Sequence, residues 1–187
     1  DSNPGLAQEY RVMSIPLVKG FRDGEAVDEF VGLQPPAAID AFLNRLVPSE
    51  AERLIAQGDE ESLRRAMALE PGNVPARVAL GRMLLADDRA LEVADVLEPV
   101  AFDQSAAALL ARVRLAGVDQ PDVVAGLSAL ARGDVELGLT HLLDAVRVAD
   151  PALREDLRAA MLGVFAELGE HHPLSVRFRR RLAQALY

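Results

Sequence analysis

Residues 49–187 carry apolar side chains at the spacing of an α-helix, and this spacing limits the fold more than any other feature of the sequence. Apolar residues recur in steps of three and four along three stretches. At 3.6 residues per turn, such steps place the side chains on one stripe of each helix. A stripe must be covered by a neighbour, so the sequence predicts helices packed side by side. The residues with this spacing are Ala76, Ala79, Leu80, Met83 and Leu84, then Leu139, Leu142, Leu143 and Val146, then Leu157, Ala160, Met161, Val164, Phe165 and Leu168.

The predicted helix ends agree with this pattern. Ser49 and Glu52 form a capping box directly after Pro48. Gly58-Asp59 and Gly133-Asp134 each combine a helix stop with a side chain that caps the next helix.

A weak internal repeat with a step of 28 residues links residues 63–71 to residues 91–99. Repeated helix pairs are typical of helical solenoids, although a generic helical bundle remains open. The segment 76–84, with Ala76 and Gly81 where a second helix would approach, resembles the first helix of a tetratricopeptide (TPR) repeat. The recurring residues are Leu63, Ala66, Leu69, Glu70 and Pro71, repeated as Leu91, Ala94, Leu97, Glu98 and Pro99.

Composition excludes several classes of protein. The net charge of −9 argues against binding to a phosphate backbone. No apolar run approaches the roughly 20 residues that span a membrane. The absence of cysteine excludes disulfides, thiolate chemistry and cysteine metal sites in this chain, and fits a cytoplasmic protein. No cofactor is predicted.

The first 47 residues differ from the rest. A short helix is predicted over residues 3–10, capped by Asp1, Ser2 or Asn3. Two strands, residues 17–21 and 26–31, flank a turn that contains Asp23-Gly24, which is a strong hairpin signal. A helix follows from Pro36. The expected fold class is α+β and mostly α.

This segment resembles the second half of a thioredoxin domain. The motifs are Ser14-Ile15-Pro16, Phe21-x-Asp23-Gly24-Glu25, Phe30-Val31-Gly32 and Ile39-x-x-Phe42-Leu43. The resemblance implies that Pro16 is cis and that Ser14, Ile15 and Pro16 form a loop that holds extended client peptide. The sequence departs from thioredoxins where Leu17 replaces a common Thr and where Lys19 and Gly20 interrupt an apolar strand.

The half of a thioredoxin domain that carries the redox motif is not in these residues. We expect it to be a separate fragment, to have been removed, or to be replaced by the edge of another molecule.

The two parts together resemble the bacterial thioredoxin–TPR co-chaperones of the YbbN/CnoX type. The resemblance implies a partial thioredoxin-like domain over residues 1–47 and a degenerate TPR-like domain over residues 48–187. It also implies a cytoplasmic co-chaperone that binds unfolded or oxidised client proteins and passes them to a chaperonin or another chaperone. Two alternatives remain: a thiol–disulfide oxidoreductase whose catalytic half is missing from this chain, and a passive scaffold.

The last helix, residues 173–187, is the predicted docking element for the partner chaperone. Its apolar residues lie near a free end, but capping of the last helix pair explains them equally well. The basic cluster in the same helix, Arg177 and Arg179 to Arg181, is either a contact for an acidic partner or a solvated face. The predicted docking residues are Phe178, Arg179, Leu182, Leu186 and Tyr187.

The remaining polar residues give no catalytic or metal site. His141 and His171-His172 lack a third ligand at suitable spacing. His141 is expected at an interface between helices. The helical carboxylates are better explained as solvated faces than as an acid/base pair; they are Asp144, Asp150, Glu155, Asp156 and Glu167.

Overall fold

A computed structural model describes residues 4–22 and 24–186. The predicted caps at Asp1, Ser2 and Asn3, the turn residue Asp23 and the docking residue Tyr187 therefore lie outside the described residues. The chain divides into two compact units, residues 1–53 and 54–187. The expected fold class is confirmed: the chain is mostly helical, with one hairpin near its start. The boundary expected between residues 47 and 48 stays a prediction.

The hairpin of the first unit forms as predicted. Strands β1 (Leu17–Arg22) and β2 (Glu25–Val31) are antiparallel, with a register shift between Gly20 and Phe21. Helix α1 (Pro4–Glu9) precedes the hairpin and α2 (Pro36–Leu46) follows it. Gly24 has a φ of +88°, which a side chain rarely adopts and which the turn requires.

The two residues that interrupt the apolar pattern of β1 both have a structural reason. Gly20 is buried beneath α2, and a Cβ on it would collide with the side chains of Leu46 and Phe42. Lys19 lies opposite Glu29 in the register and forms an ion pair with it. Phe42 also packs edge to face on Phe30, with ring centroids 5.0 Å apart. The absence of a side chain at Gly20 thus lets α2 pack closely on the sheet.

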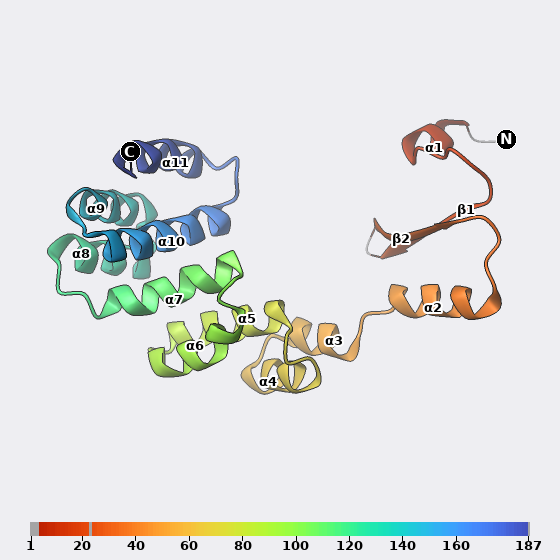
Figure 1. Ribbon diagram of the computed structural model, residues 1–187, viewed down its shortest axis with the longest axis horizontal. Helices are drawn as coiled ribbons and strands as arrows, with labels where there is room; N and C mark the ends of the chain where they lie inside the picture. Colours follow the sequence, from red (N-terminus) through yellow and green to blue (C-terminus); the bar gives the residue numbers. More distant parts are fainter. Residues whose placement is uncertain (1–3, 23, 187) are drawn as a thin grey trace. The chain divides into compact units, whose positions relative to one another are not determined.

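The second unit is a helical array (Figure 1). Its helices are joined by short turns, and each packs on a neighbour as the stripes predicted. Helix α3 (Glu50–Gln57) spans the boundary between the two units. In the part of the chain that the structure describes, the helices after it are α4 (Glu60–Leu69), α5 (Val74–Ala86), α6 (Ala90–Leu97), α7 (Gln104–Ala116), α8 (Pro121–Ala131), α9 (Val135–Val148), α10 (Pro151–Leu168) and α11 (Pro173–Leu186).

The predicted caps are present. The Ser49 N–H donates to Glu52 Oε2 at 2.9 Å, and the Glu52 N–H donates to Ser49 Oγ at 3.0 Å, which completes the capping box. Gly58 and Gly133 have positive φ, and Asp59 and Asp134 accept hydrogen bonds from the first turns of α4 and α9. Asn73, Asp103 and Asp150 cap α5, α7 and α10 in the same way.

The 28-residue repeat is wrong in its register. Leu63 is 1% exposed, whereas Leu91, its expected equivalent, is 87% exposed. The N-caps of α4 and α6 are Asp59 and Arg89, a step of 30 residues. A shift of 28 therefore misaligns the helices by two residues, about 200° around the axis. The residue that matches Leu63 is Val93, which is buried like Leu63.

The same step of 30 separates the N-caps of the next two helices, Asn73 and Asp103. Ala76 and Ala106 are equivalent under this step, and both are fully buried. Gly81 corresponds to Ala111, and a Cβ on Gly81 would lie 2.8 Å from Leu97 Cδ1. The small residue at this position therefore lets two helices approach, as the sequence indicated.

Candidate protein-binding surfaces

The loop before β1 is the first candidate surface. The Ile15–Pro16 bond is cis, as the thioredoxin resemblance implied. The Gly32 N–H donates to the Pro16 carbonyl at 2.8 Å, which ties the loop to the end of β2. Met13 is 96% exposed and Ile15 is 87% exposed, so two large apolar side chains of this loop face solvent.

A shallow groove lies beside this loop. The Lys19–Glu29 pair and Tyr10 contribute polar groups to it, whereas Leu17 and Val31 are apolar. Such a groove suits an extended segment with alternating side chains. Ser14 lines it and is exposed, so the structure brings one of the three predicted client-binding residues to the groove itself. The residues that line it are Tyr10, Arg11, Met13, Ser14, Leu17, Lys19, Glu29 and Val31.

The last helix, α11, is the second candidate surface, and here the structure corrects the sequence interpretation. Phe178 is 0% exposed and Leu182 is 4% exposed, because both side chains fill the core shared with α9 and α10. Neither side chain is available to a partner. Both instead cover the core at the last helix pair, which is the alternative that the sequence left open. Leu186 is half-buried against the same core, and Arg179 is exposed. Docking through Arg179 and Leu186 stays a prediction.

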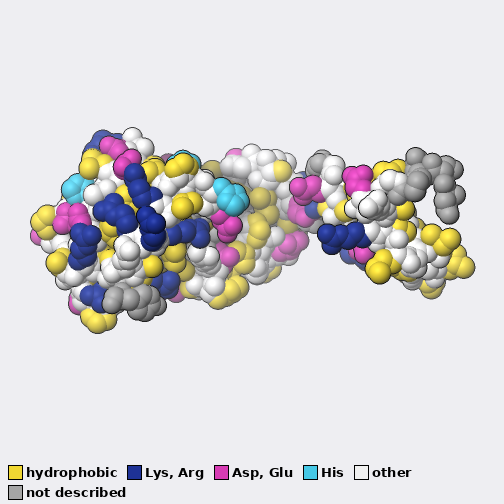
Figure 2. Space-filling view, turned by 90° about the horizontal axis from the view of Figure 1, so that it is seen from above, with side chains coloured by type: hydrophobic (Ala, Val, Ile, Leu, Met, Phe, Trp, Pro, Cys, Tyr) yellow, Lys and Arg dark blue, Asp and Glu magenta, His cyan; other side chains and the backbone are white. Residues whose placement is uncertain are grey.

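The arginines of α11 cover aromatic rings as well as facing solvent. The guanidinium carbons of Arg177 and Arg181 lie 4.9 and 5.0 Å from the centre of the Phe178 ring. Arg179 lies over Phe165. Arg177 also pairs with Glu136 of α9 at 2.6 Å. Arginine side chains gather on the face of the array seen in Figure 2. The α11 segment contains no acidic residue, so its exposed face is basic.

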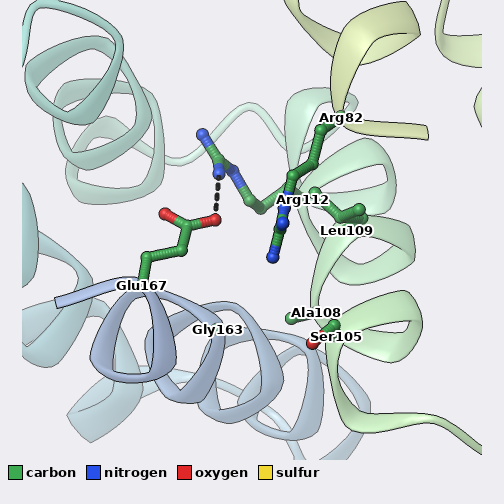
Figure 3. A pocket seen from close by; sticks show the side chains of 7 residues that line it. All are labelled: Arg82, Ser105, Ala108, Leu109, Arg112, Gly163 and Glu167. Atoms are coloured by element: carbon green, nitrogen blue, oxygen red, sulfur yellow. Dashed lines mark ion pairs between the residues drawn. The ribbon is translucent and has the colours of Figure 1, made fainter. Parts of the chain in front are cut away.

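A narrow cleft, with room for about one water molecule, lies between α5, α7 and α10 (Figure 3). Arg82 of α5 and Arg112 of α7 both project into it. Glu167 of α10 faces them, with 3.9 Å between Arg112 Nη1 and Glu167 Oε1. At its narrow part α7 and α10 approach so closely that a Cβ on Gly163 would lie 2.5 Å from Ala108 Cβ. Sequence reasoning did not identify this cleft, because its residues come from three separate helices.

Comparisons with known proteins agree with the two parts. Residues 103–187 match the model of a tetratricopeptide repeat family. An N-terminal segment of 45 residues is 47% identical to a thioredoxin of Staphylococcus epidermidis, covering 24% of this chain and 43% of that protein. A thioredoxin of Staphylococcus aureus is 44% identical over 45 residues.

The whole chain aligns with uncharacterized proteins of Mycobacterium tuberculosis and Mycobacterium bovis. Each is 27% identical over 201 aligned residues, with 100% of this chain and 66% of the relative covered. The chain therefore spans slightly less than two thirds of these relatives. A thioredoxin-related segment is followed here by a TPR region. TPR regions bind other proteins, so protein binding is the general activity that these findings support.

Two of the three histidines, His141 and His172, have hydrogen-bond partners. His141 Nδ1 lies 3.0 Å from Asp122 Oδ1, which places it between α9 and α8, as expected. His172 Nδ1 accepts the Leu174 N–H at the start of α11. Among residues 4–22 and 24–186, no group of three or more His, Cys, Asp or Glu residues is arranged to hold a metal ion. No helix within these ranges combines the length and apolar character of a membrane span.

The chain contains no cysteine and therefore no thioredoxin redox pair. Binding of client peptide at the cis-proline loop, which the thioredoxin resemblance implies, stays a prediction. The surfaces that remain are two exposed protein-binding candidates and one internal cleft.

Proposed function

We propose that this chain is the protein-binding part of a cytoplasmic co-chaperone that holds unfolding clients and hands them to a partner chaperone, a chaperonin or another ATP-driven chaperone. The observation that carries the proposal is the pair of apolar side chains, Met13 and Ile15, exposed next to the cis-proline. The similarity to both thioredoxins and a TPR family, in the order found in the YbbN/CnoX type, supports the same assignment.

The cis-proline loop suits a client because unfolding proteins expose extended apolar segments. Burial of one such side chain contributes about 1.5–3 kcal/mol. Two side chains supply enough free energy for a contact that forms and dissociates readily, since association itself has an entropic cost. A weak and reversible contact is what a holding chaperone needs to release its client.

The basic face of α11 suits a partner chaperone. Arg179 and Arg180 are exposed, and α11 has no acidic residue that would neutralise them. The whole chain has a net charge of −9, whereas the exposed face of α11 is positively charged. It favours an acidic surface on the partner and raises the rate of association with it.

The experiment has two readouts on the same 187-residue chain. Light scattering of a thermally unfolding model enzyme measures holding activity, and we expect the chain to suppress aggregation at a near-stoichiometric ratio. Titration into purified bacterial chaperonin measures docking, and we expect the double substitution Arg179→Gln and Arg180→Gln to weaken it at least fivefold. A chain with neither activity overturns the proposal and leaves a passive scaffold.

Point substitutions are preferable to a truncation at Pro173 in this experiment. Truncation removes Phe178 and Leu182 from the core and so disturbs α9 and α10. The substitutions at Arg179 and Arg180 remove exposed charge and leave the buried side chains of Phe178 and Leu182 in the core. The thermal unfolding of the double variant should match that of the unmodified chain.

A further inference from the structure

Met13, in the loop before β1, is the most exposed of the large apolar residues that the structure describes, with 96% of its surface facing solvent. The sequence contains four methionines and neither cysteine nor tryptophan. The thioether of methionine is therefore the most easily oxidised group in the chain.

The other three methionines are covered by the helical array. Met161 of α10 is 0% exposed and lies in the core that α9, α10 and α11 share. Met67 of α4 and Met83 of α5 are partly buried against the core of the preceding helices. An oxidant must reach the sulfur atom, so the burial of these side chains predicts that Met13 is oxidised first.

Met13 also belongs to the surface that we assign to client proteins. It lines the groove beside the cis-proline loop together with Tyr10 and Leu17, and Ile15 of the same loop is 87% exposed. The unbranched, flexible side chain of methionine adapts to partners of different shape. A chemical change at Met13 therefore alters a binding surface and leaves the packed core intact.

We propose that Met13 is a reversible oxidation site, and that its conversion to methionine sulfoxide by a peroxide weakens the hold of the loop on client proteins. This inference rests on the proposed function, because it regulates the client surface assigned there.

The chemical step is the transfer of one oxygen atom. A lone pair of Met13 Sδ attacks one oxygen of hydrogen peroxide, and the S–O bond forms as the O–O bond breaks. The other oxygen leaves as hydroxide, takes the proton of the transferred oxygen and becomes water. Sulfur loses two electrons and the peroxide gains them. Methionine sulfoxide reductases reverse this oxidation.

The product changes the character of the loop. The sulfoxide is polar, whereas the thioether is apolar, so Ile15 remains as the one large apolar side chain of the exposed pair. The other strongly exposed apolar residues contain no sulfur: Leu33 is 93%, Leu91 is 87% and Phe102 is 84% exposed. Oxidation therefore removes apolar contact at the loop and leaves it unchanged at these residues.

Peptide mapping by mass spectrometry tests the site. The full chain is treated with hydrogen peroxide, and the sulfoxide fraction at each methionine is followed over time. We expect Met13 to react before Met67 and Met83, and about tenfold or more faster than Met161. Circular dichroism should be unchanged when Met13 alone is oxidised, because its side chain faces solvent.

Light scattering of a thermally unfolding model enzyme tests the consequence, after the peroxide has been removed with catalase. Oxidation should weaken the suppression of aggregation about threefold or more. Methionine sulfoxide reductases of both stereospecificities, supplied with dithiothreitol, should restore it.

Variants assign the effect to one sulfur atom, with each variant compared with its own untreated sample. Met13→Leu has no sulfur at this position, so treatment should leave its activity unchanged. Met83→Leu is the matched control, and treatment should weaken it as much as the unmodified chain. Met13→Gln places a polar side chain in the loop and should resemble the oxidised chain before any treatment.

Three outcomes would overturn the proposal: earlier oxidation of another methionine, undiminished suppression of aggregation once Met13 is oxidised, or an equal loss on treatment of Met13→Leu. A chain that suppresses aggregation equally before and after treatment retains the proposed function and loses the switch. A chain that fails to suppress aggregation before treatment overturns the proposed function and the switch with it, while the peptide map still decides whether Met13 is the oxidation site.

Discussion

Arg89 Nη1 lies 2.8 Å from Glu60 Oε2, so the N-cap residue of α6 forms an ion pair with the first residue of α4. Arg64 and Glu92 complete the network: Arg64 pairs with both carboxylates, and Arg89 also pairs with Glu92. The network joins equivalent helices of consecutive repeats on their solvent side. It marks the repeat step more directly than the apolar pattern does.

The network makes stability depend on acidity. Hydrogen bonds from Arg89, and then from Arg64, lower the pKa of Glu60 from 4.5 to about 2. A depressed carboxyl pKa stabilises the folded state above the unfolded pKa, and the stabilisation is lost as the pH falls through the folded value. We expect Glu60→Gln to lower the urea midpoint at pH 7, and the difference from the unmodified chain to shrink between pH 4.5 and about 2.

Glu61→Gln is the matched control for Glu60. Glu61 is the next residue of α4, is exposed, and forms no ion pair among the described residues. Its substitution should leave the urea midpoint unchanged across the same pH range. Equal effects of the two substitutions would mean that the network is not the cause.

Close approach of α8 and α9 predicts an effect of adding one methyl group. A Cβ on Gly138 would lie 2.7 Å from Leu130 Cγ and 3.0 Å from the Gly126 carbonyl oxygen. Gly138→Ala gains about 1 kcal/mol of helix propensity but incurs an overpacking cost of about 1–3 kcal/mol. Because one of the contacted atoms is backbone, we expect a net destabilisation of about 1 kcal/mol, measured by urea unfolding.

Gly72→Ala provides the comparison for Gly138. Nothing lies within 4 Å of a Cβ placed on Gly72, and its φ is not in the left-handed region. This substitution should be neutral or slightly stabilising. Stabilisation by Gly138→Ala as well would show that the two helices separate at little cost.

The buried ring of α11 predicts a large loss of stability. Phe178 is among the largest fully buried side chains, and its ring fills a core between three helices. Phe178→Ala should destabilise the fold by about 3–5 kcal/mol. Val176→Ala, two residues earlier on the exposed face, should change stability by less than about 0.5 kcal/mol. Comparable effects of the two substitutions in thermal unfolding would contradict the assigned core.

The exposed loop predicts a change in activity without a change in stability. Met13→Ser and Ile15→Ser remove apolar surface that faces solvent. We expect each to reduce the suppression of aggregation about threefold or more, since each deletes about 1.5–3 kcal/mol of possible contact with a client. The unfolding temperature should not change.

Leu91→Ser is the control for the loop because Leu91 is as exposed as Ile15 and lies on α6. It should leave the suppression of aggregation intact. An equal loss of activity for Leu91 would indicate that clients bind any exposed apolar side chain, and the loop would have no special role.

Local features were determined by the sequence. The capping box at Ser49 and Glu52, the aspartate caps and the hairpin turn at Gly24 depend on residues a few positions apart, and all of them formed as predicted. The apolar stripes also depend only on helical spacing, so the buried face of α9 and α10 was predictable. The thioredoxin motifs identified the cis bond before Pro16 in the same way.

Tertiary structure alone decided which residues share a surface. It put Phe178 and Leu182 in the core, corrected the repeat step from 28 to 30 residues, and brought Arg82, Arg112 and Glu167 into one cleft. The physical reason is that a periodic pattern gives the direction of a side chain around its own helix. It does not state which other helix lies on that side, and burial, pairing and groove formation all depend on that second helix.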